Sequence, residues 1–379
     1  MSINKNSQKA PNLRFKGFTD DWEQRKLNDE VYFFNKKRIP IESDDRKPGQ
    51  YPYYGATGII DYVDNYIFDG EYILLAEDGA NIVTRNSPIA YITKGRFWVN
   101  NHAHIMKMKF GSNYFLLQLL ERNNYEKFNS GTAQPKLNSQ VLKNITFNFP
   151  GEEEKTRIGS FLKNLDHNIT LHQRKLDQLN QLKEALLQQM FPGKGETVPK
   201  LRFAGFEGDW EERKLGEISK IKTGSSDLQD ADTTGNYPFF VRSENIERSN
   251  RFLFEGEAIL IPGEGRLGEI YHYINGKFDY HQRVYKISNF SDYDVQGLFV
   301  LYYLKNNFKR HALKYTVKAT VDSLRLPTLL EFNIMVPNLI EQEKIGNVLN
   351  CIENTIILQQ RKLDQLQNMK QVLLENMFI

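Results

Sequence analysis

Polar, basic and aromatic residues fill the segments between short apolar runs in each half of the chain. Their types are those that contact bases and phosphates. Arginine bonds bidentately to guanine, asparagine or glutamine bonds to adenine, aspartate accepts from cytosine, and lysine meets phosphate. The candidate DNA-contacting residues of the first half are Tyr54, Thr57, Arg85, Asn101, His102, Thr132, Gln134 and Lys136. Those of the second half are Arg242, Ser243, Asn245, Arg266, His281, Gln282, Arg283, Lys318, Thr320 and Asp322. The alternative is that these are ordinary solvated loop residues.

Residues 263–268 read GEGRLG, which matches the dinucleotide-binding pattern G-x-G-x-x-G after an apolar run. That pattern binds a pyrophosphate when a helix begins next, so that the helix N-terminus faces the phosphates. Here EIYHYI follows, with β-branched and aromatic residues in alternation and Asn275-Gly276 as a turn, which predicts a hairpin. The matching segment of the first half, AEDGANIV, lacks the pattern. The pattern therefore favours a tight surface loop over a nucleotide site.

His102 and His104 form an H-x-H pair on a predicted strand, where alternate residues share a face and could bind a metal. No carboxylate or cysteine has ligand-like spacing nearby, so we favour a structural or DNA-facing role and expect no metal. The segment GKGET at 193–197 is not a P-loop. The sequence also lacks N-P-P-[YF], D-P-P-[YF], G-x-S-x-G, H-E-x-x-H and C-x-x-C. We therefore expect no catalytic site in this chain.

The composition suits a soluble globular protein, with 379 residues, 40% hydrophobic and 26% charged. No apolar run approaches the ~20 residues of a membrane helix, and the start MSINKNSQKAPNLRF lacks the apolar core of a signal peptide. The net charge is only +3, so contacts with nucleic acid must come from local basic patches. The single cysteine, Cys351, excludes an intrachain disulfide and fits a reducing compartment, so we expect a cytoplasmic protein.

The chain contains a long internal repeat. Residues 11–27 read PNLRFKGFTDDWEQRKL, and residues 199–215 read PKLRFAGFEGDWEERKL. Residues 174–191 read RKLDQLNQLKEALLQQMF, and residues 361–378 read RKLDQLQNMKQVLLENMF. Both pairs of blocks have nearly the same separation, so one long unit is duplicated. The segments between the blocks diverge, which favours two homologous modules that recognise different things.

The diverged middles predict mixed α/β modules. The runs YILLA at 72–76, IAYIT at 89–93 and HIMKMKF at 104–110 have the residue types of strands, and AILIP, EIYHYI and RVYKI are their counterparts. A helical stretch comes next in each middle, at 113–128 and 295–313. A last strand then ends at Pro150 or Pro337.

Two long helices close the two halves, and each has an apolar seam with alternating spacings of three and four. Its residues are Leu162, Leu165, Ile169, Leu176, Leu179 and Leu186 in the first helix and Leu349, Ile352, Ile356, Leu363, Leu366 and Leu373 in the second. His172 and Lys183 interrupt the first seam where Gln359 and Lys370 interrupt the second. Roughly 37 residues make a helix of about 55 Å, longer than packing on one module requires. We therefore expect the two helices to pair as a coiled coil.

The segment PGKGETV at 192–198 has the composition of an exposed linker and leads from the first helix into the second module. The second helix must then run back along the first, so the pair is antiparallel, with pseudo-two-fold symmetry and Ile379 near Pro11. The predicted fold class is α+β. The predicted domains are module one at 1–151, helix one at 152–191, the linker and module two at 192–338, and helix two at 339–379.

With the repeat, the paired helices and SGTAQPKLNSQVL at 130–142, the chain resembles the specificity subunits of type I restriction–modification systems. P-x-LRF-x-GF…W-x-x-RKL at the head of each half and RKLDQL…MF at its close are similar to that family. So are YPYYGATG and the GTAQPKLN loop of its target-recognition domains. Module two departs from the pattern, with YTVKATVDSLRL in place of FNSGTAQPKLNS. The resemblance covers essentially the whole chain.

The resemblance implies that each module reads one half of a split DNA site and that the helices set the spacer. It also implies double-stranded DNA, two methyltransferase subunits and restriction (translocase) subunits as partners. S-adenosylmethionine, ATP and Mg²⁺ would belong to those partners. Two other functions remain open from the residues alone: a coiled-coil protein-interaction scaffold without DNA specificity, and a nucleotide-binding enzyme built on GEGRLG.

Overall fold

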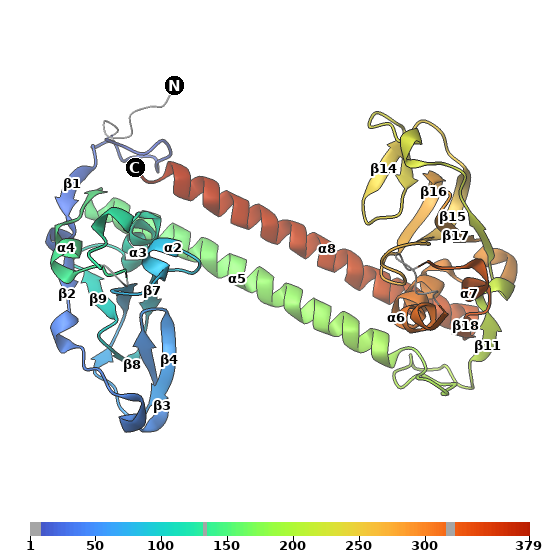
Figure 1. The fold of residues 1–379 in the computed structure, drawn as a ribbon, viewed down its shortest axis with the longest axis horizontal. Coiled ribbons are helices and arrows are strands. Elements are labelled where there is room, and N and C mark those ends of the chain that lie inside the picture. Colours follow the sequence, from blue (N-terminus) through green and yellow to red (C-terminus); the bar gives the residue numbers. More distant parts are fainter. Residues whose placement is uncertain (1–8, 132–134, 316–322) are drawn as a thin grey trace. The chain divides into compact units, whose positions relative to one another are not determined.

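The computed structural model describes residues 9–131, 135–315 and 323–379 and divides the chain into two compact units (Figure 1). Unit 1 comprises Met1–Gln173 and Lys362–Ile379, and unit 2 comprises Arg174–Arg361. The two long helices, α5 (Glu152–Gln189) and α8 (Leu339–Asn376), contribute to both units. No helix in the described ranges is both long enough and apolar enough to cross a membrane.

Unit 1 contains two four-stranded sheets and one strand pair, with the orders β2-β9-β6-β7, β4-β3-β8-β5 and β1-β10. The strands are β1 Glu23–Lys26, β2 Val31–Phe33, β3 Pro48–Gly55, β4 Gly58–Val63, β5 Phe68–Asp69, β6 Tyr72–Ala76, β7 Ala90–Thr93, β8 Arg96–Val99, β9 Ala103–Met108 and β10 Thr146–Phe149. The helices are α1 Leu27–Glu30, α2 Asn81–Thr84, α3 Asn113–Arg122 and α4 Ser139–Asn144, with 3-10 turns at Asn35–Lys37, Ser43–Asp45 and Glu126–Phe128.

Unit 2 contains a six-stranded sheet with the order β12-β17-β15-β16-β13-β14 and the pair β11-β18. The strands are β11 Glu211–Lys214, β12 Lys220–Thr223, β13 Tyr237–Phe240, β14 Ile246–Ser249, β15 Phe254–Pro262, β16 His272–Tyr280, β17 Val284–Ser288 and β18 Asn333–Val336. The helices are α6 Gly297–Tyr315 and α7 Leu326–Leu330, with 3-10 turns at Leu215–Glu217, Leu228–Asp230 and Phe290–Tyr293.

The apolar runs form the central strands, as predicted. YILLA forms β6 and AILIP forms the end of β15, and their side chains are almost all buried because both faces of these strands are covered. GEGRLG forms the loop between β15 and β16, which pair antiparallel, so the glycines lie in a loop as predicted and no helix comes directly after them. The predicted hairpin with its turn at Asn275-Gly276 is wrong. Both residues lie within β16, opposite Glu257 and Gly256, where the long register of β15 with β16 overrides the local turn preference.

The repeated blocks build equivalent cores in the two units. In unit 1, the ring of Trp22 contacts Phe378 from the end of the second repeat, with centroids 6.2 Å apart. In unit 2, the ring of Trp210 contacts Phe191 from the end of the first repeat, with centroids 6.4 Å apart. Each repeat head therefore packs against the closing block of the other repeat. The backbone N–H of Leu13 also donates to the backbone oxygen of Asn376 (2.8 Å), as expected from the predicted return of the C-terminus.

The arginine of each LRF segment binds a buried glutamate in the first turns of a long helix. Arg14 pairs with Glu154 of α5, and Arg202 pairs with Glu341 of α8, each with an N–O distance of 2.7 Å. These hydrogen bonds raise the pKa of both arginines, and both glutamates are almost fully buried. Removing either partner would leave a buried charge unpaired, which explains why both repeats share this pair.

The predicted seam residues of the long helices are shielded from solvent. Leu162, Leu165, Leu176, Leu349, Leu363 and Leu366 are buried, and Ile169, Leu179, Leu186, Ile352, Ile356 and Leu373 are half-buried. The ends of the seams join the module cores: Leu162 belongs to the core of unit 1 and Leu349 to the core of unit 2. At these ends, the seam residues therefore pack into the cores of the modules.

Candidate nucleic-acid interface

Three segments of unit 2 meet at one carboxylate, Glu264, in the loop after the central strand β15. Its side chain is 19% exposed. One oxygen accepts from Arg242, in the loop after β13, with Nη1–Oε2 at 3.0 Å. The other oxygen binds Arg283, in the turn between β16 and β17. The two arginine side chains are 48% and 57% exposed, so their remaining N–H groups are accessible to an anionic or base ligand.

A second cluster of charges continues from the same loop. Arg266 binds Glu244 (2.7 Å) and Glu269 (2.8 Å), and Lys309 of α6 also binds Glu269 (2.7 Å). The hydrogen bond from Lys309 lowers the pKa of Glu269, and the hydrogen bond to Glu269 raises the pKa of Arg266. These side chains are mostly exposed, and such pairs contribute little to stability. The arginine can therefore exchange its partner for a phosphate at small cost.

In unit 1 the equivalent acid is Asp78, which lies just after the central strand β6 and contacts two other segments. Its carboxylate accepts from Nδ1 of His102, in the turn between β8 and β9, at 2.9 Å. The ammonium of Lys136 lies 3.8 Å from the carboxylate of neighbouring Glu77. His102, Lys136 and Asn101 are exposed. Four of the predicted contact residues of the first half, including Thr57 in the β3–β4 turn, are thus exposed in loops.

The backbone around the two carboxylates is connected in the same way. Asp78 forms an isolated antiparallel bridge with Lys136, and Glu264 forms one with Ser323. Asp78 and Glu264 also match when DGEYILLAEDG is aligned with EGEAILIPGEG. The two units therefore place an acid at the same point of the same loop arrangement.

The turns that carry the partners of these acids are also equivalent. The side chain of Asn100 accepts the backbone N–H of His102 (2.8 Å), and Nδ1 of His281 accepts the backbone N–H of Arg283 (3.0 Å). His281 is buried, and its Nε2 lies 3.1 Å from Asp227. A hydrogen bond inside each turn thus fixes the backbone of the residue that reaches the acid.

Three predicted contact residues are used by the fold itself. The ring of Tyr54 stacks on Tyr91, with centroids 5.7 Å apart. Arg85 has a φ of 55° after α2, donates to the backbone oxygen of Glu121 and pairs with its carboxylate at 3.6 Å. His281 is held between the backbone of its own turn and Asp227. These contacts give each of the three residues a structural role, which the local sequence did not indicate.

The other predicted residues include exposed and half-buried loop positions. Asn245 and Gln282 are exposed, and Ser243 is half-buried and accepts the N–H of Asn245 at 3.2 Å. Gln282 donates to Asp227 at 3.0 Å. Thr132, Gln134, Lys318, Thr320 and Asp322 lie outside the described residues. The carboxylates that hold the basic residues were missed by sequence reasoning, although the alignment of the two central strands could have identified Asp78 and Glu264.

The prediction that the H-x-H pair lies on one strand is wrong. β9 begins at Ala103, so His102 lies in the preceding turn, while His104 is buried in the strand. Nε2 of His104 donates to the backbone oxygen of Leu137 (2.7 Å), and burial lowers the pKa of His104. In the described ranges, no group of three or more His, Cys, Asp or Glu residues is arranged to hold a metal ion.

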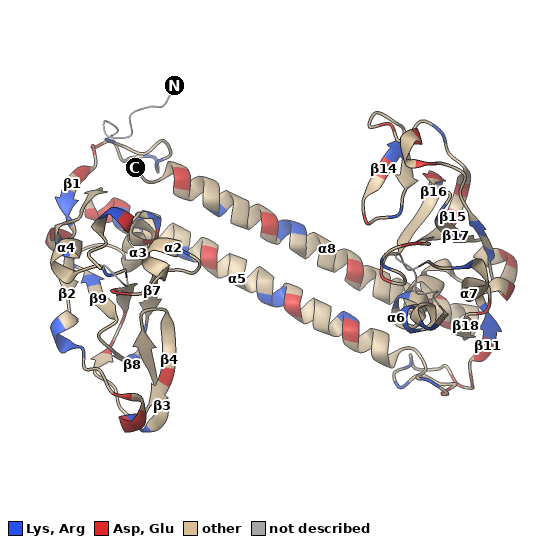
Figure 2. Cartoon of the chain, viewed as in Figure 1, with Lys and Arg blue, Asp and Glu red and all other residues tan. Residues whose placement is uncertain are grey.

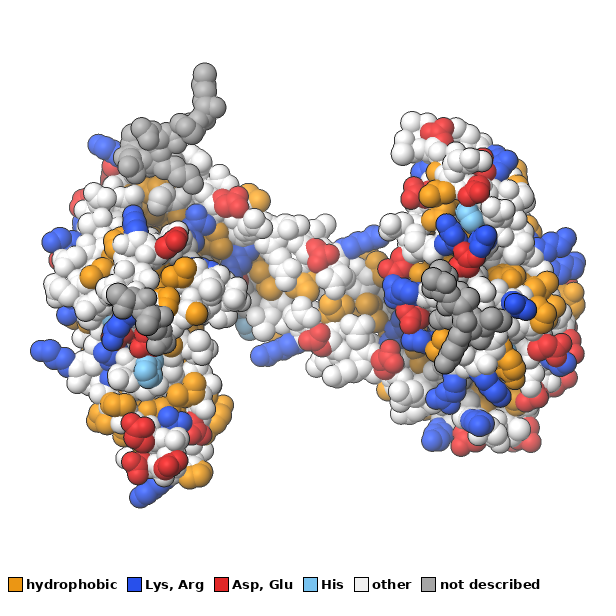
Figure 3. Space-filling view, viewed as in Figure 1, with side chains coloured by type: hydrophobic (Ala, Val, Ile, Leu, Met, Phe, Trp, Pro, Cys, Tyr) orange, Lys and Arg blue, Asp and Glu red, His pale blue; other side chains and the backbone are white. Residues whose placement is uncertain are grey.

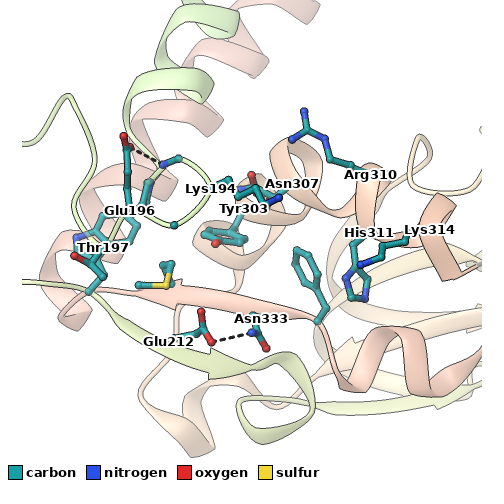
Figure 4. A pocket seen from close by; sticks show the side chains of 16 residues that line it. Lys194, Glu196, Thr197, Glu212, Tyr303, Asn307, Arg310, His311, Lys314 and Asn333 are labelled. Carbon is teal, nitrogen blue, oxygen red and sulfur yellow. Dashed lines mark hydrogen bonds between the residues drawn. The ribbon is translucent and has the colours of Figure 1, made fainter.

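Unit 2 also has a pocket of about 650 Å³ between the linker at 192–197, α6 and β18 (Figure 4). Arg310, His311 and Lys314 reach its rim from α6, and Glu212 accepts from Asn333 at 2.8 Å. None of the predicted DNA-contacting residues lines this pocket. We therefore assign the candidate interface to the loops around Glu264 and Asp78.

Charges of both signs are mixed over each unit (Figure 2). Figure 3 shows Lys and Arg side chains gathered on one face of unit 2, with Asp and Glu side chains among them. The basic character is thus local, as the small net charge of +3 requires.

Each unit also ties a module helix to the long helices through one carboxylate. In unit 2, Glu353 of α8 binds Lys183 of α5 (2.9 Å), Lys305 of α6 (2.8 Å) and the hydroxyl of Tyr302 (2.7 Å). Burial would raise the pKa of Glu353, but Lys305, Lys183 and Tyr302 outweigh it and lower that pKa to about 2. In unit 1, Asp166 of α5 binds Lys370 of α8 (2.7 Å) and the hydroxyl of Tyr114 of α3. The lysines that interrupt the predicted seams therefore have carboxylate partners.

The family model described as the type I restriction modification DNA specificity domain matches residues 19–181 and 207–368. A putative type I restriction enzyme specificity subunit of Haemophilus influenzae, S.HindORF215P, is 36% identical over 141 residues, which cover 37% of this chain and 36% of that protein. The type I restriction enzyme MjaVIII specificity subunit of Methanocaldococcus jannaschii is 22% identical over 387 residues, which cover 93% of this chain and 90% of that protein.

The crystal structure of the type I restriction–modification S subunit from M. genitalium has the same fold. Its TM-score is 0.72 at 15% identity, and the match covers 98% of this chain and 99% of that one. The two matched segments of the family model cover most of the present sequence and correspond to its two halves. The chain therefore belongs to the type I restriction–modification DNA specificity family and carries that family's domain twice.

Proposed function

We propose that this chain is the specificity subunit of a type I restriction–modification complex and that each module recognises one half of a two-part DNA site. The observation that carries the proposal is the duplicated specificity domain, with similarly connected loops around Asp78 and Glu264 that bear different side chains. Equivalent loops with different chemistry suit two half-sites of different sequence.

Catalysis belongs to partner subunits in this proposal. Two methyltransferase subunits would bring S-adenosylmethionine, and restriction subunits would bring ATP and Mg²⁺, in the cytoplasm. Exposed apolar side chains on the long helices, such as Leu171, Leu182 and Leu358, support binding of protein partners. The purified chain alone should incorporate no labelled methyl groups into DNA, and incorporation without partners would contradict this division of labour.

The long helices would act as an antiparallel coiled coil that sets the distance between the half-sites, with domain boundaries at 1–151, 152–191, 192–338 and 339–379. Two reciprocal ion pairs support this pairing. Asp166 and Glu353 occupy matching positions in the repeats, as do Lys183 and Lys370, and each acid binds the lysine of the other repeat. Two helices of the same sequence pattern make such reciprocal pairs when they run in opposite directions.

An insertion tests the role of the helices in spacing. Four residues added after Gln178 would lengthen α5 by ~6 Å and rotate the remainder of the helix by about 400°, close to one full turn. DNA rises ~3.4 Å per base pair, so the preferred spacer should grow by one or two base pairs while the bases of each half remain the same. Binding with the original spacer would assign the spacing to the linker at 192–198 instead.

Binding of duplexes by the chain with its methyltransferase partner tests the main proposal. A selection from random duplexes should return two short conserved segments separated by a spacer of fixed length and free sequence. Recovery of random sequence would instead favour a protein-interaction scaffold. Isothermal titration of the chain with nucleotides should show no heat of binding, and saturable binding would favour a nucleotide-dependent enzyme.

A further inference from the structure

We infer that Glu264 is a positioning residue for base recognition by module two, because it holds Arg283 and Arg242 in the orientation that bonds a guanine. The inference rests on the proposed function and names one base in the second half-site. Arginine recognises guanine through two parallel hydrogen bonds to O6 and N7, which requires a fixed guanidinium plane.

The geometry around Glu264 restrains Arg283 at two points, the guanidinium and the backbone. Its carboxylate is 19% exposed, and each oxygen binds one guanidinium, with Arg242 at 3.0 Å. Behind Arg283, the backbone N–H bonds to Nδ1 of His281 at 3.0 Å, and the buried imidazole of His281 reaches Asp227 at 3.1 Å. Arg283 is therefore held at its backbone and at its guanidinium, while the side chain remains 57% exposed.

The ion pairs of Glu264 with Arg242 and Arg283 contribute little to the stability of the fold. Ion pairs between half-exposed arginines and a carboxylate contribute little to the free energy of folding because water competes for both charges. Two arginines on one carboxylate also leave a net positive charge in the loop, which suits a nucleic-acid surface. We therefore assign to these ion pairs the role of orienting the guanidinium groups.

Unit 1 supports the inference because the equivalent acid holds a different side chain. Asp78 accepts from Nδ1 of His102 at 2.9 Å, and a neutral imidazole that donates from Nδ1 has Nε2 as an acceptor. An acceptor suits the exocyclic amino group of adenine or cytosine, whereas a guanidinium suits guanine. The same acid position would thus present different chemistry in the two modules.

The test is selection from randomised duplexes by the full chain with its methyltransferase subunit, comparing wild type with Glu264→Gln and Arg283→Lys. Glu264→Gln removes the charge that binds both arginines, and Arg283→Lys keeps the charge but removes the planar fork. In both variants, the preference for guanine over the other bases at one position of the second half-site should fall about tenfold. The first half-site should not change. Glu255→Gln, an exposed acid on β15 paired only loosely with Lys277 (3.8 Å), is the matched control and should behave as wild type.

Three results would overturn the inference. The first is a second half-site without guanine. The second is a guanine preference in Glu264→Gln or in Arg283→Lys that is unchanged from that of the wild type. The third is a uniform gain in affinity for all sequences in Glu264→Gln, with its guanine preference intact, which would make Glu264 a charge regulator only. If Glu264→Gln fails to fold, Glu264→Asp replaces it: this variant keeps the charge but draws the carboxylate back by one methylene, and it should also lower the guanine preference. A wild-type complex that selects no two-part site would sink the proposed function itself, which is a different outcome.

Discussion

The loops around Asp78 in unit 1 and around Glu264 in unit 2 share their backbone connections but differ in nearly every side chain that they expose. Each acid lies after a central strand and forms an isolated β-bridge with a residue of the segment that leads to the last strand of its module. Asp78 holds one histidine, whereas Glu264 holds two arginines. The equivalent backbone bridges preserve the frame of these loops, so their side chains can differ without loss of the fold.

The carboxylates of the long helices show a similar difference. Asp166 binds one lysine and one tyrosine, whereas Glu353 binds two lysines and one tyrosine. The tyrosines come from α3 and α6, and these contacts connect each module to the helices on which it sits. Unit 2 therefore has the more highly charged connection, and the two units should respond differently when the acid is removed.

A module exchange is expected to have the largest effect on recognition. Replacing residues 28–150 with the matching region of a family member that reads another site should change the whole first half-site and leave the second as it was. The reason is that each module has its own core and its own loop cluster. Selection from random duplexes measures both halves at once. If the folded chimera changes both half-sites, the modules do not recognise DNA independently.

Removal of Glu353 in unit 2 should lower the free energy of unfolding more than removal of Asp166 in unit 1. Glu353→Ala leaves two lysines close together without their acid and should lower the free energy of unfolding by about 2–4 kcal/mol. Asp166→Ala leaves one lysine and should cost about 1–2 kcal/mol. Urea unfolding monitored by circular dichroism gives both values, with the exposed Glu343→Ala as a control within about 0.5 kcal/mol of wild type. Equal losses at the two sites would show that the second lysine of unit 2 adds nothing.

Acid should weaken unit 2 through Glu353. Its folded pKa of about 2 lies below the ordinary value of 4.5, so its contribution is fully present above about pH 5 and is lost as the pH falls toward 2. The loss should approach about 3 kcal/mol. Urea unfolding between pH 7 and pH 3 should show this decline in wild type. Glu353→Gln should be less stable at pH 7 and should show a smaller decline, and an unchanged pH profile would contradict the assignment.

The smallest effect is expected from Lys136 in unit 1. Lys136→Ala should weaken binding to all sequences and reduce the slope of log K against log salt by about one. The half-site preferences should remain because we assign Lys136 to a phosphate, and phosphate contacts carry no sequence information. Lys16→Ala, an exposed lysine in the head block, is the control for charge alone. A slope unchanged from wild type would place Lys136 away from the DNA backbone.

The duplicated features of the fold could be predicted from the sequence because each one appears twice with the same spacing. The heptad pattern placed α5 and α8, and the apolar runs placed β6 and β15. The glycines of GEGRLG, which occur in the second half only, were correctly placed in a loop. The turn at Asn275-Gly276 was wrong because strand register depends on the partner strand, which a local pattern does not include.

The candidate site was predicted in part. Arg242, Arg266 and Arg283 were predicted contacts, and all three are exposed and cluster with the acids of neighbouring loops. Those acids were missed, and the internal roles of Arg85 and His281 were not foreseen. Ion pairs of this kind join loops that are distant in sequence, and no local spacing reports them. Only the alignment of Asp78 with Glu264 carried such a signal.

Methylation mapping of host DNA tests the central claim most directly. DNA from cells that express the methyltransferase subunit with this chain, or without it, is read by methylation-sensitive long-read sequencing. With the chain present, methylated adenines should fall in one two-part motif with a spacer of fixed length, one in each half, and this motif should disappear without the chain. Methylation in an undivided motif, or the same methylation with and without the chain, would contradict its role as the subunit that selects the site.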